Sequence, residues 1–599
     1  MCGIVGYLGS HQAAPIILDA LRRLEYRGYD SAGIATVSDG VLERRRAVGK
    51  LVNLADLLVE HPLPGRAGIG HTRWATHGAP TETNAHPHRS GPVAVVHNGI
   101  VENFRELREE LFAAGANLES DTDTETVAVL CARLMASGAG PVEAAMSVVD
   151  RLRGAFALAF LFDGEDDLIV AARKGSPLAV GHGEDEIYLG SDAIALGPLT
   201  QRVTYLEEGD RAVLRRSGVE IFDASGAGVE RAVTHISPAD AAAEKGGHRH
   251  FMAKEIAEQP AVLRRTVGAY LDGDRIALPE GLLDGVERVV LIGCGTAFYA
   301  GLVAKYWFEQ VGGIPAECDI ASEYRYREPP VGGGTLAVFV SQSGETADTL
   351  AALRYLKGRA IRTAAVVNVQ TSTIARECDA VLPLHAGPEI GVASTKAFTC
   401  QLAVLACLAL EAARLRGHDI AQGIEALRAL PALMDAAIGA GAAVEDIAGE
   451  LSRVGDVLFL GRGRMYPLAM EGALKLKEIS YIHAEGYPSG ELKHGPIALI
   501  DEDMPVVVLA PSDALFEKTS SNMQEVMARA GRVLLVSDEA GIRQAGHGAW
   551  RTLAMPSVPD LIAPIVYAVP IQLLAYHTAT AKGTDVDQPR NLAKSVTVE

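Results

Sequence analysis

Up to about residue 210, the chain is a series of short apolar runs separated by glycine, aspartate and asparagine. The runs include G-I-V-G-Y-L, A-G-I-A-T-V, V-A-V-V-H-N, F-A-L-A-F-L-F and L-I-V-A-A-R. Runs of this length between turn residues indicate β-strands. Two longer stretches, near 102–114 and 124–136, have the apolar spacing that is typical of helices. We therefore expect an α+β domain over residues 2–215, in which stacked antiparallel sheets lie between outer helices in an αββα order.

The hydrophobic pattern changes beyond a polar stretch at 238–250, which we interpret as a linker. An apolar strand, a Gly- or Ser-containing loop and a helix now alternate, which is typical of parallel α/β units. The pattern also repeats, since V-V-L-I-G-C-G-T matches a later V-L-F-L-G-R-G-R, and two more strands match at a similar offset. This repetition predicts two copies of one α/β domain with a parallel sheet, over 279–419 and 448–589, and then a tail at 590–599.

The composition limits the partners of the chain. With 48% hydrophobic and 22% charged residues, the 599-residue chain is typical of a globular protein with several domains. A net charge of −20 offers no basic stripe for a phosphate backbone, so we expect no nucleic-acid partner. Its seven cysteines are scattered without a C-x-x-C pair, which suits a reducing compartment. The sequence shows neither a secretory leader nor 18 consecutive apolar residues, so we predict a cytoplasmic protein without a membrane partner.

Cys2 carries the first candidate chemistry, because removal of Met1 would place it at the amino terminus. A terminal cysteine has a free α-amine two bonds from its own Cβ, and this amine can act as general base for the thiol. Part of such an amine is already neutral at pH 7, so the pair needs little adjustment. The ordinary alternative for a lone cysteine here is a small apolar residue of a first β-strand.

Polar motifs further along supply candidate partners for Cys2. G-H-T-R-W-A-T-H-G contains Arg73, whose guanidinium can hold an α-carboxylate through two hydrogen bonds. Asp123, in S-D-T-D-T-E, can receive an α-ammonium, so the two together suit a free amino acid. Asn98 and the backbone N–H of Gly99, in H-N-G, can stabilise an oxyanion. Each residue alone has an ordinary explanation, such as an ion pair or a helix cap, but together they indicate acyl transfer.

These motifs, with C-G-I-V-G, E-Y-R-G-Y-D-S-A-G and V-H-N-G-I-V-E-N, resemble the class II glutamine amidotransferase domain. That family is a group of N-terminal-nucleophile hydrolases, which release ammonia from glutamine. The resemblance implies Cys2 as nucleophile, its own amine as base, and Asn98 with Gly99 as the oxyanion hole. It also implies that the residues near glutamine are Arg73, Trp74, Thr76, His77 and Asp123.

The first of the two repeated domains offers a candidate phosphate site. S-Q-S-G-E-T follows an apolar strand and precedes a helical run, where backbone N–H groups and hydroxyls can hold a phosphate. A helix N-cap is the ordinary alternative for such a loop. The loop lacks the lysine of a Walker motif, and C-G-T-A-F-Y lacks the third glycine of a dinucleotide fingerprint. A sugar phosphate therefore fits better than a nucleotide, and its candidate ligands are Ser341, Gln342, Ser343 and Thr346.

The second repeated domain and the tail hold candidate acid–base residues. E-G-A-L-K-L-K-E places Glu471, Lys475 and Glu478 on one face of a helix. A solvated Glu–Lys pair is the ordinary explanation. About 10 Å of helical rise separates the two glutamates, so they cannot share a proton, and catalytic work would fall on one of them. His494 follows on a Gly-Pro loop, and Lys594 in the tail could form a Schiff base only from a folded, partly desolvated position.

The loops, this helix and the tail D-Q-P-R-N-L-A-K-S-V-T-V-E resemble sugar-isomerase (SIS) domains. As a set with the glutaminase motifs, they resemble the family of isomerising glutamine:fructose-6-phosphate aminotransferases over essentially the whole chain. The resemblance implies that Lys594 forms an imine with the ketose, that Glu478 moves a proton between C1 and C2, and that His494 assists ring opening. Lys475 would belong to the same catalytic set. Further implied contacts of the sugar are Thr296, Val392 and Ser394.

The implied reaction is the entry step to amino-sugar synthesis, from L-glutamine and D-fructose 6-phosphate to glucosamine 6-phosphate and glutamate. We expect no cofactor and no metal, and the family implies a homodimer. Ala297 departs from the family, which often has serine after G-C-G-T, so one sugar contact is in question. Other synthases on this glutaminase would need a pyrophosphate loop or an S-G-G-x-D-S loop, and neither is present. The alternative from another class is a sugar-phosphate sensor without synthase activity, which would need neither Cys2 nor Lys594.

Overall fold

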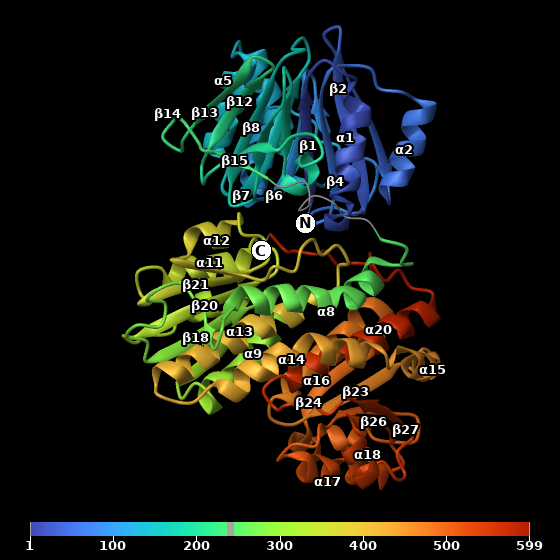
Figure 1. The fold of residues 1–599 in the computed structure, drawn as a ribbon. Coiled ribbons are helices and arrows are strands. Elements are labelled where there is room, and N and C mark those ends of the chain that lie inside the picture. Colours follow the sequence, from blue (N-terminus) through green and yellow to red (C-terminus); the bar gives the residue numbers. More distant parts are fainter. Residues whose placement is uncertain (1, 237–244, 598–599) are drawn as a thin grey trace. The chain divides into compact units, whose positions relative to one another are not determined.

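The structure of the protein, a computed structural model, describes residues 2–236 and 245–597. The chain forms two compact units (Figure 1). The first is Met1–Glu244 together with the end of the tail from Ala593, and the second is Lys245–Leu592. Of the linker that we predicted at 238–250, residues 238–244 lie outside the described residues.

Two antiparallel sheets form the centre of the first unit. One sheet has the strand order β15 (Val233–His235), β11 (Arg202–Tyr205), β9 (Ala179–His182), β10 (Ile187–Gly190), β1 (Gly3–Leu8), β4 (Ala67–Arg73), β2 (Ser31–Ser38), β3 (Val41–Val48). The other has the order β14 (Gly228–Val229), β13 (Gly218–Phe222), β12 (Arg211–Arg215), β8 (Ile169–Lys174), β7 (Gly154–Phe162), β6 (Val93–Val101), β5 (His88–Ser90). The alternation of side chains along each strand gives each sheet an inner and an outer face.

Helices cover the outer faces of both sheets. The inner faces pack on each other through small and branched side chains such as Ile4, Val96 and Ala159. On one side lie α1 (Ala13–Arg22), α2 (Leu51–Glu60) and the short α6 (Ala193–Leu196). On the other lie α3 (Phe104–Ala113), α4 (Asp123–Ala136) and α5 (Pro141–Arg151). The predicted αββα order is confirmed.

Two parallel sheets form the second unit, and they share one strand order. The sheet of the first SIS copy runs β19 (Ala316–Ile320), β18 (Arg288–Gly293), β20 (Thr335–Ser341), β21 (Arg362–Val367), β22 (Ala380–Pro383). The sheet of the second copy runs β24 (His483–Pro488), β23 (Asp456–Gly461), β25 (Pro505–Leu509), β26 (Arg532–Asp538), β27 (Arg551–Met555). In both sheets the second strand along the chain lies at the edge beside the first. The predicted pair of parallel α/β domains is thus confirmed.

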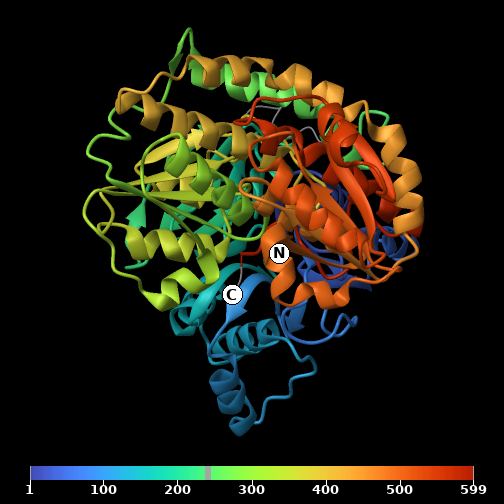
Figure 2. The same ribbon diagram turned by 90° about the horizontal axis from the view of Figure 1, so that it is seen from below.

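The two copies lie side by side, as Figure 2 shows with the first copy in green to yellow and the second in orange to red. The helices of the first copy are α9 (Thr296–Gln310), α10 (Ala321–Arg327), α11 (Ala347–Leu356), α12 (Thr373–Glu377) and α13 (Lys396–Leu415). Those of the second are α16 (Met465–Ser480), α17 (Phe516–Met527), α18 (Glu539–Ala545), α19 (Ala563–Val566) and α20 (Ala568–Lys582). Further elements are α8 (Phe251–Tyr270), the hairpin β16 (Leu271–Asp272) and β17 (Arg275–Ile276), α14 (Ala421–Ile438) and α15 (Gly441–Leu451).

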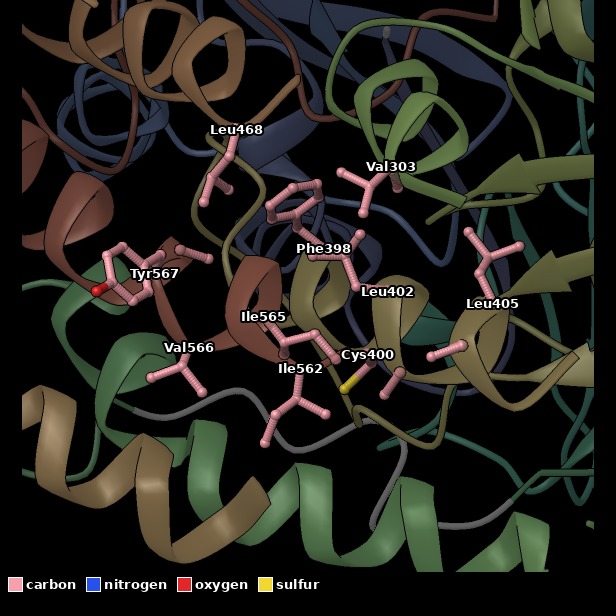
Figure 3. Close-up of a cluster of buried hydrophobic side chains, with 14 of the residues drawn as sticks. Val303, Phe398, Cys400, Leu402, Leu405, Leu468, Ile562, Ile565, Val566 and Tyr567 are labelled. Carbon is pink, nitrogen blue, oxygen red and sulfur yellow. The ribbon is translucent and has the colours of Figure 1, made fainter. Parts of the chain in front are cut away.

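A shared hydrophobic core joins the two copies. Figure 3 shows Phe398 and Leu402 of α13 near Val303 of the first copy and near Leu468 and Ile565 of the second. All five side chains are fully buried. Burial of a side chain of this size contributes about 1.5–3 kcal/mol. The copies therefore form one body, which can hold a site made from both.

Helix α13 is long and apolar enough to cross a membrane by length and composition. However, 89% of its most apolar window is buried inside the fold, as in the core helix of a globular domain. The pair α14 and α15 passes the same test only as a bent pair, with an angle of 53°. We had predicted no such stretch, because Lys396 and Glu411 interrupt the apolar run of α13.

The strand order determines where a ligand binds in each copy. In an open parallel sheet, ligands bind at the carboxyl ends of the strands, where the strand order reverses. In the first copy this point lies between β18 and β20. Thr296 follows β18, and the loop from Ser341 to Thr346 follows β20. The candidate phosphate ligands therefore lie at the point that the topology favours.

Candidate active sites

Cys2 lies directly before β1, at the end of that strand where β4 ends. The antiparallel register places Gly3 opposite Thr72 and so brings Cys2 to the end of β4, where the Trp74 backbone N–H donates to Cys2 Sγ at 3.1 Å. Burial raises the pKa of the Cys2 thiol, while the Trp74 N–H and Arg73 act in the opposite direction. The resting group is therefore the thiol, which needs a base before it can attack a carbonyl.

Asn98 and Gly99 lie in β6, on the other sheet. The Asn98 side-chain Nδ2 donates to the Cys2 carbonyl oxygen at 3.0 Å, so the amide NH₂ group of Asn98 faces Cys2. Gly99 has a φ of +123°, and a Cβ there would lie 2.0 Å from the Ala155 carbonyl oxygen. Only glycine fits this position. The two residues that we predicted as an oxyanion hole are thus next to Cys2, while their role stays a prediction.

Arg73 and Asp123, the predicted glutamine ligands, are both nearly fully buried. Arg73 donates to the carbonyl oxygens of His77, Gly78 (3.0 Å) and Ala79 (3.4 Å), and so holds that loop. Asp123, the first residue of α4, accepts from the Val101 backbone N–H at 2.8 Å. Burial lowers the pKa of Arg73, although nearby carboxylates oppose this.

Thr76 and His77, two more of the predicted glutamine residues, lie in the loop that follows β4. Both are more accessible than Arg73, and the His77 ring packs edge-on against Phe104 at 5.1 Å between centroids. The loop therefore has an accessible side, with its buried side fixed by Arg73.

The Ser341–Thr346 loop of the first SIS copy is held by its own hydroxyls. Ser341 Oγ accepts from the Gly344 backbone N–H at 3.0 Å and lies 3.2 Å from Thr346 Oγ1. Ser343 Oγ accepts from the Glu345 N–H at 3.2 Å. Gly344 has a φ of +64°, and an added Cβ would lie 1.9 Å from Ser372 Oγ. Gln342 lies between these residues in the same turn.

Thr296 connects this site to the second copy. Its Oγ1 donates to Glu471 Oε1 at 3.1 Å, so the loop after β18 touches helix α16. Lys475 Nζ lies 3.6 Å from Glu471 Oε1 and 2.5 Å from Glu478 Oε2. Glu471 and Lys475 are each 1% exposed, whereas the Glu478 side chain is 19% exposed. The solvated pair that the sequence pattern favoured is wrong, because α16 is packed between the two copies.

Burial sets the charges of this cluster. It raises the pKa of Glu471 to about 8, although Lys475 opposes the shift. Burial alone would lower the pKa of the Lys475 ammonium, but the Glu471 and Glu478 carboxylates outweigh it, and that pKa is raised. Lys475 therefore stays charged and pairs most closely with Glu478. One lysine contacts both glutamates, while the expectation that they do not share a proton stays a prediction.

Val392 and Ser394 lie in the loop between β22 and α13, which buried carboxylates organise. Glu389 accepts from the Thr395 and Ala397 backbone N–H groups, each at 2.9 Å, and from the Ser394 hydroxyl at 3.4 Å. The Val392 N–H donates to the Asp587 carbonyl oxygen at 3.1 Å. The sequence analysis gave no role to Glu389, although it lies in the same run as Ser394, or to Asp587, which is far along the chain from Val392.

Asp587 has a second role at the start of α8. Its carboxylate accepts from the backbone N–H groups of Phe251 (2.9 Å) and Met252 (3.1 Å), and so caps a helix more than 300 positions earlier in the chain. One residue of the carboxyl-terminal region thus binds both α8 and the Val392 loop. A helix cap from a distant part of the chain leaves no local sequence signal.

His494 and Lys594 complete the predicted set. His494 is exposed at the end of a short 3₁₀ helix, Ser489–His494, and no hydrogen bond or ion pair of the described residues joins it to the Glu471–Lys475–Glu478 cluster. Lys594 is half-buried and belongs to the segment from Ala593 that packs with the first unit. Among residues 2–236 and 245–597, no group of three or more His, Cys, Asp or Glu could hold a metal ion.

Comparisons with known proteins identify the domains and the family of the chain. The glutamine amidotransferase domain family matches residues 71–198, and the SIS domain family matches 282–411 and 450–582. The chain is 58% identical, over the full length of both chains, to a glutamine–fructose-6-phosphate aminotransferase (isomerizing) of Zymomonas mobilis, and 58% identical over the full length to that of Brucella suis. The solved C-terminal domain of glucosamine-fructose-6-phosphate aminotransferase from Francisella tularensis is 45% identical with a TM-score of 0.57, and the match covers 58% of this chain and 100% of that one.

The fold and sites therefore define a glutamine amidotransferase joined to two sugar-isomerase domains. At 58% identity over the whole chain, it belongs to the glutamine–fructose-6-phosphate aminotransferase (isomerizing) family.

Proposed function

We propose that this chain transfers the amide nitrogen of glutamine to fructose 6-phosphate, and that glucosamine 6-phosphate and glutamate are the products. The observation that carries the acceptor half is the hydrogen bond from Thr296 to Glu471. It joins the candidate phosphate loops of one SIS copy to the buried acid–base cluster of the other. A protein that only sensed a sugar phosphate would need neither this cluster nor Cys2.

The glutaminase reaction begins at Cys2. After removal of Met1, the free amine takes the thiol proton and Sγ attacks the side-chain amide carbon of glutamine. Asn98 Nδ2 and the Gly99 N–H donate to the oxygen that becomes negative. The α-ammonium returns its proton to the amide nitrogen, ammonia leaves as the C–N bond breaks, and water then hydrolyses the thioester to glutamate. Arg73 and Asp123 hold the α-carboxylate and α-ammonium of the substrate.

The acceptor reaction begins when the Lys594 amine condenses with the C2 carbonyl of the opened sugar and releases water. Ammonia replaces the lysine at C2. Glu478 then takes a proton from C1 and returns it to C2, which converts the C2 imine into the 2-amino aldose. Lys475 Nζ lies 2.5 Å from Glu478 Oε2 and pairs with this carboxylate. His494 assists ring opening, and the Ser341–Thr346 loop with Thr296 binds the phosphate end.

The start of the tail is anchored to the second SIS copy. The Arg590 backbone N–H donates at 2.8 Å to the Tyr481 hydroxyl, and Tyr481 is the C-cap of the helix that carries Glu478. Lys594 follows Arg590 by four residues, and this anchor supports the proposal that its amine acts in the acceptor reaction.

Two variants separate the two reactions. Cys2→Ala should release no glutamate from glutamine, yet still isomerise fructose 6-phosphate, because the reactions use different folds. Lys594→Arg should lose isomerisation and synthesis but keep slow glutamine hydrolysis, since arginine supplies no neutral amine. Borohydride added with fructose 6-phosphate should trap an adduct at Lys594. Glutamate release by Cys2→Ala, or an adduct at Lys475 or Lys493 instead, would overturn the assignment.

We also propose that the protein is a cytoplasmic homodimer that binds neither nucleic acid nor membrane. The acidic composition, with a net charge of −20, supports the exclusion of nucleic acid. Sedimentation equilibrium of the purified chain should give twice the 63.2 kDa mass of one chain. A monomer at micromolar concentration would contradict the dimer, without bearing on the reaction.

A further inference from the structure

His71, in β4, lies beneath the Asn98 side chain across the interface of the two sheets of the first unit. Both residues are nearly fully buried, at 0% and 3% exposure. His71 Nε2 lies 2.9 Å from the His97 carbonyl oxygen and 3.1 Å from Asn98 Oδ1. The reaction described above gives His71 no role.

The His97 carbonyl oxygen fixes the tautomer of His71. A carbonyl oxygen can only accept, so Nε2 must carry a hydrogen. A donor at Nε2 requires that the Asn98 amide turn its oxygen toward His71. The amide NH₂ then faces the opposite side, where it donates to the Cys2 carbonyl oxygen at 3.0 Å. One imidazole N–H therefore decides which end of the Asn98 amide faces the reacting groups.

The surroundings keep His71 in this neutral state. Burial lowers the pKa of His71 to about 3, and Arg73 and His97 add to the shift. The ring stacks on His86 at 4.2 Å between centroids, and His86 packs edge-on against His88 at 4.8 Å. His71 Nδ1 has no hydrogen-bond partner among the described residues. The charged groups that act on the stack are Arg73, Arg44 and Arg46, while Asp123 acts on His97.

We propose that His71 is a positioning residue of the glutaminase, whose Nε2–H orients the Asn98 amide so that its NH₂ faces the oxyanion. The proposal rests on the proposed function, since it assigns a role within that reaction. Without His71, the Asn98 amide can rotate by half a turn and present its oxygen to the negative charge. That penalty arises only in the transition state, so turnover should fall while glutamine binding changes little.

The substitutions distinguish this role from simple packing. In glutamine the side-chain nitrogen can occupy the place of Nε2, whereas in asparagine it reaches only the place of Nδ1. We expect His71→Gln to keep kcat for glutamine hydrolysis within about tenfold of the parent. His71→Asn and His71→Leu should lose about 100- to 1,000-fold in kcat, the usual effect of one oxyanion donor. KM for glutamine should stay within threefold in each variant.

A double-variant cycle gives the sharpest readout. If His71 acts through Asn98, then His71→Leu combined with Asn98→Ala should be no slower than Asn98→Ala alone. His88→Leu is the matched control, because His88 is another buried histidine of the stack that bonds Thr122 rather than Asn98. It should keep kcat within threefold. Circular dichroism and fructose 6-phosphate isomerisation check the fold of each variant.

Each outcome decides one question. If the parent protein releases no glutamate from glutamine, the proposed function fails and the role of His71 falls with it. If the parent is active but His71→Gln and His71→Asn lose activity equally, or the losses multiply in the double variant, the positioning role is wrong and the proposed function stands. Should His71→Leu fail to fold, the glutamine and asparagine variants still carry the comparison.

Discussion

The two SIS copies share one strand order but differ in the loop after their third strand. Pairing within the sheets aligns Phe339 with Val508, and therefore Ser343 with Ser512. In the first copy the loop contains serine, glycine and threonine at the positions where the second copy has Ala510, Asp513 and Leu515. The two copies therefore share the strands around this loop but differ in the polar side chains that the loop carries.

One aligned position explains why the loop after the third strand differs between the two copies. The fourth strands align Asn368 with Asp538. In the first copy the Asn368 side chain bonds Gly387 and Ala386 in the loop after β22. In the second copy Asp538 accepts from the Ser512 N–H (3.1 Å), the Ser512 hydroxyl (2.6 Å) and the Gly541 N–H (3.0 Å).

The second copy therefore satisfies the donors of Ser512, the counterpart of Ser343, with its own carboxylate. Asp538 accepts from the Ser512 N–H and hydroxyl, and it also caps its own helix α18 at Gly541. The first copy retains a loop suited to a phosphate, while the second contributes helix α16 with its buried Glu–Lys–Glu cluster. The proposed function thus assigns phosphate binding to the first copy and proton transfer to the second.

The largest expected effect comes from the acid–base residue of the second copy. Glu478→Gln should lower isomerisation and synthesis by about 100- to 10,000-fold, the usual contribution of a general base. Glutamine hydrolysis measured without sugar should be unchanged. Glu485→Gln, in the neighbouring β24, is the control and should stay near the parent rate. A loss in Glu478→Gln of less than tenfold would mean that proton transfer lies elsewhere.

The aligned serines give the next effect. Ser343→Ala should raise KM for fructose 6-phosphate by about 10- to 150-fold, because a hydrogen bond to a charged group contributes about 1.5–3 kcal/mol. Ser512→Ala should leave that KM within twofold, since its hydroxyl bonds Asp538. Steady-state kinetics of the two variants test the division directly. Equal changes in KM would show that both copies bind the sugar phosphate.

Asp538→Ala should reduce stability rather than catalysis. Loss of this mostly buried acceptor should cost about 1–3 kcal/mol of unfolding free energy, measured by urea denaturation. Burial alone would raise the pKa of Asp538, but hydrogen bonds from Ser512 and Gly541 lower it below the ordinary 3.8. A lowered folded pKa means that the stabilisation is present at neutral pH and is lost as the pH falls below that value. The free energy of unfolding of the parent should thus exceed that of Asp538→Ala by more at pH 7 than at pH 3. An equal difference in unfolding free energy at the two pH values would contradict this argument.

Ala297→Ser should have the smallest effect. Ala297 lies beside Thr296 in the first turn of α9, at the ligand end of β18. A restored hydroxyl adds one neutral hydrogen bond of about 0.5–1.5 kcal/mol, so KM for fructose 6-phosphate should change by less than about tenfold. Turnover should barely change, because the contact is equal in ground and transition states. A several-hundredfold change in turnover would give this loop a part in the chemistry.

Local patterns predicted the domains because each pattern repeats along its own element. The short apolar runs between turn residues predicted the antiparallel sheets, and the alternation of strand, loop and helix predicted the parallel ones. The positions of the motifs predicted which loops lie at strand ends. Helix α4 begins at Asp123 and ends at Ala136, close to the predicted 124–136. Helix α1 was missed, although Ala13, Ile17, Ala20 and Leu21 lie on one face at helical spacing.

The unpredicted parts of the site are contacts between distant segments. No local pattern indicates that Asp587 caps α8, that Thr296 bonds Glu471, or that His71 bonds Asn98, because each pair is joined only by tertiary packing. The same reason explains why the sequence pattern left a solvated Lys475 open as an alternative. A Glu–Lys pair at helical spacing is the same in sequence whether its helix faces solvent or another domain.

The central claim is that one chain couples glutamine hydrolysis to amination of a sugar phosphate. The most direct measurement uses glutamine labelled with ¹⁵N in its amide group, incubated with fructose 6-phosphate and the purified protein. The account predicts glutamate and ¹⁵N-labelled glucosamine 6-phosphate in equal amounts, and neither product from the Cys2→Ala variant with glutamine as the nitrogen source. Release of glutamate without any labelled amino sugar would contradict it.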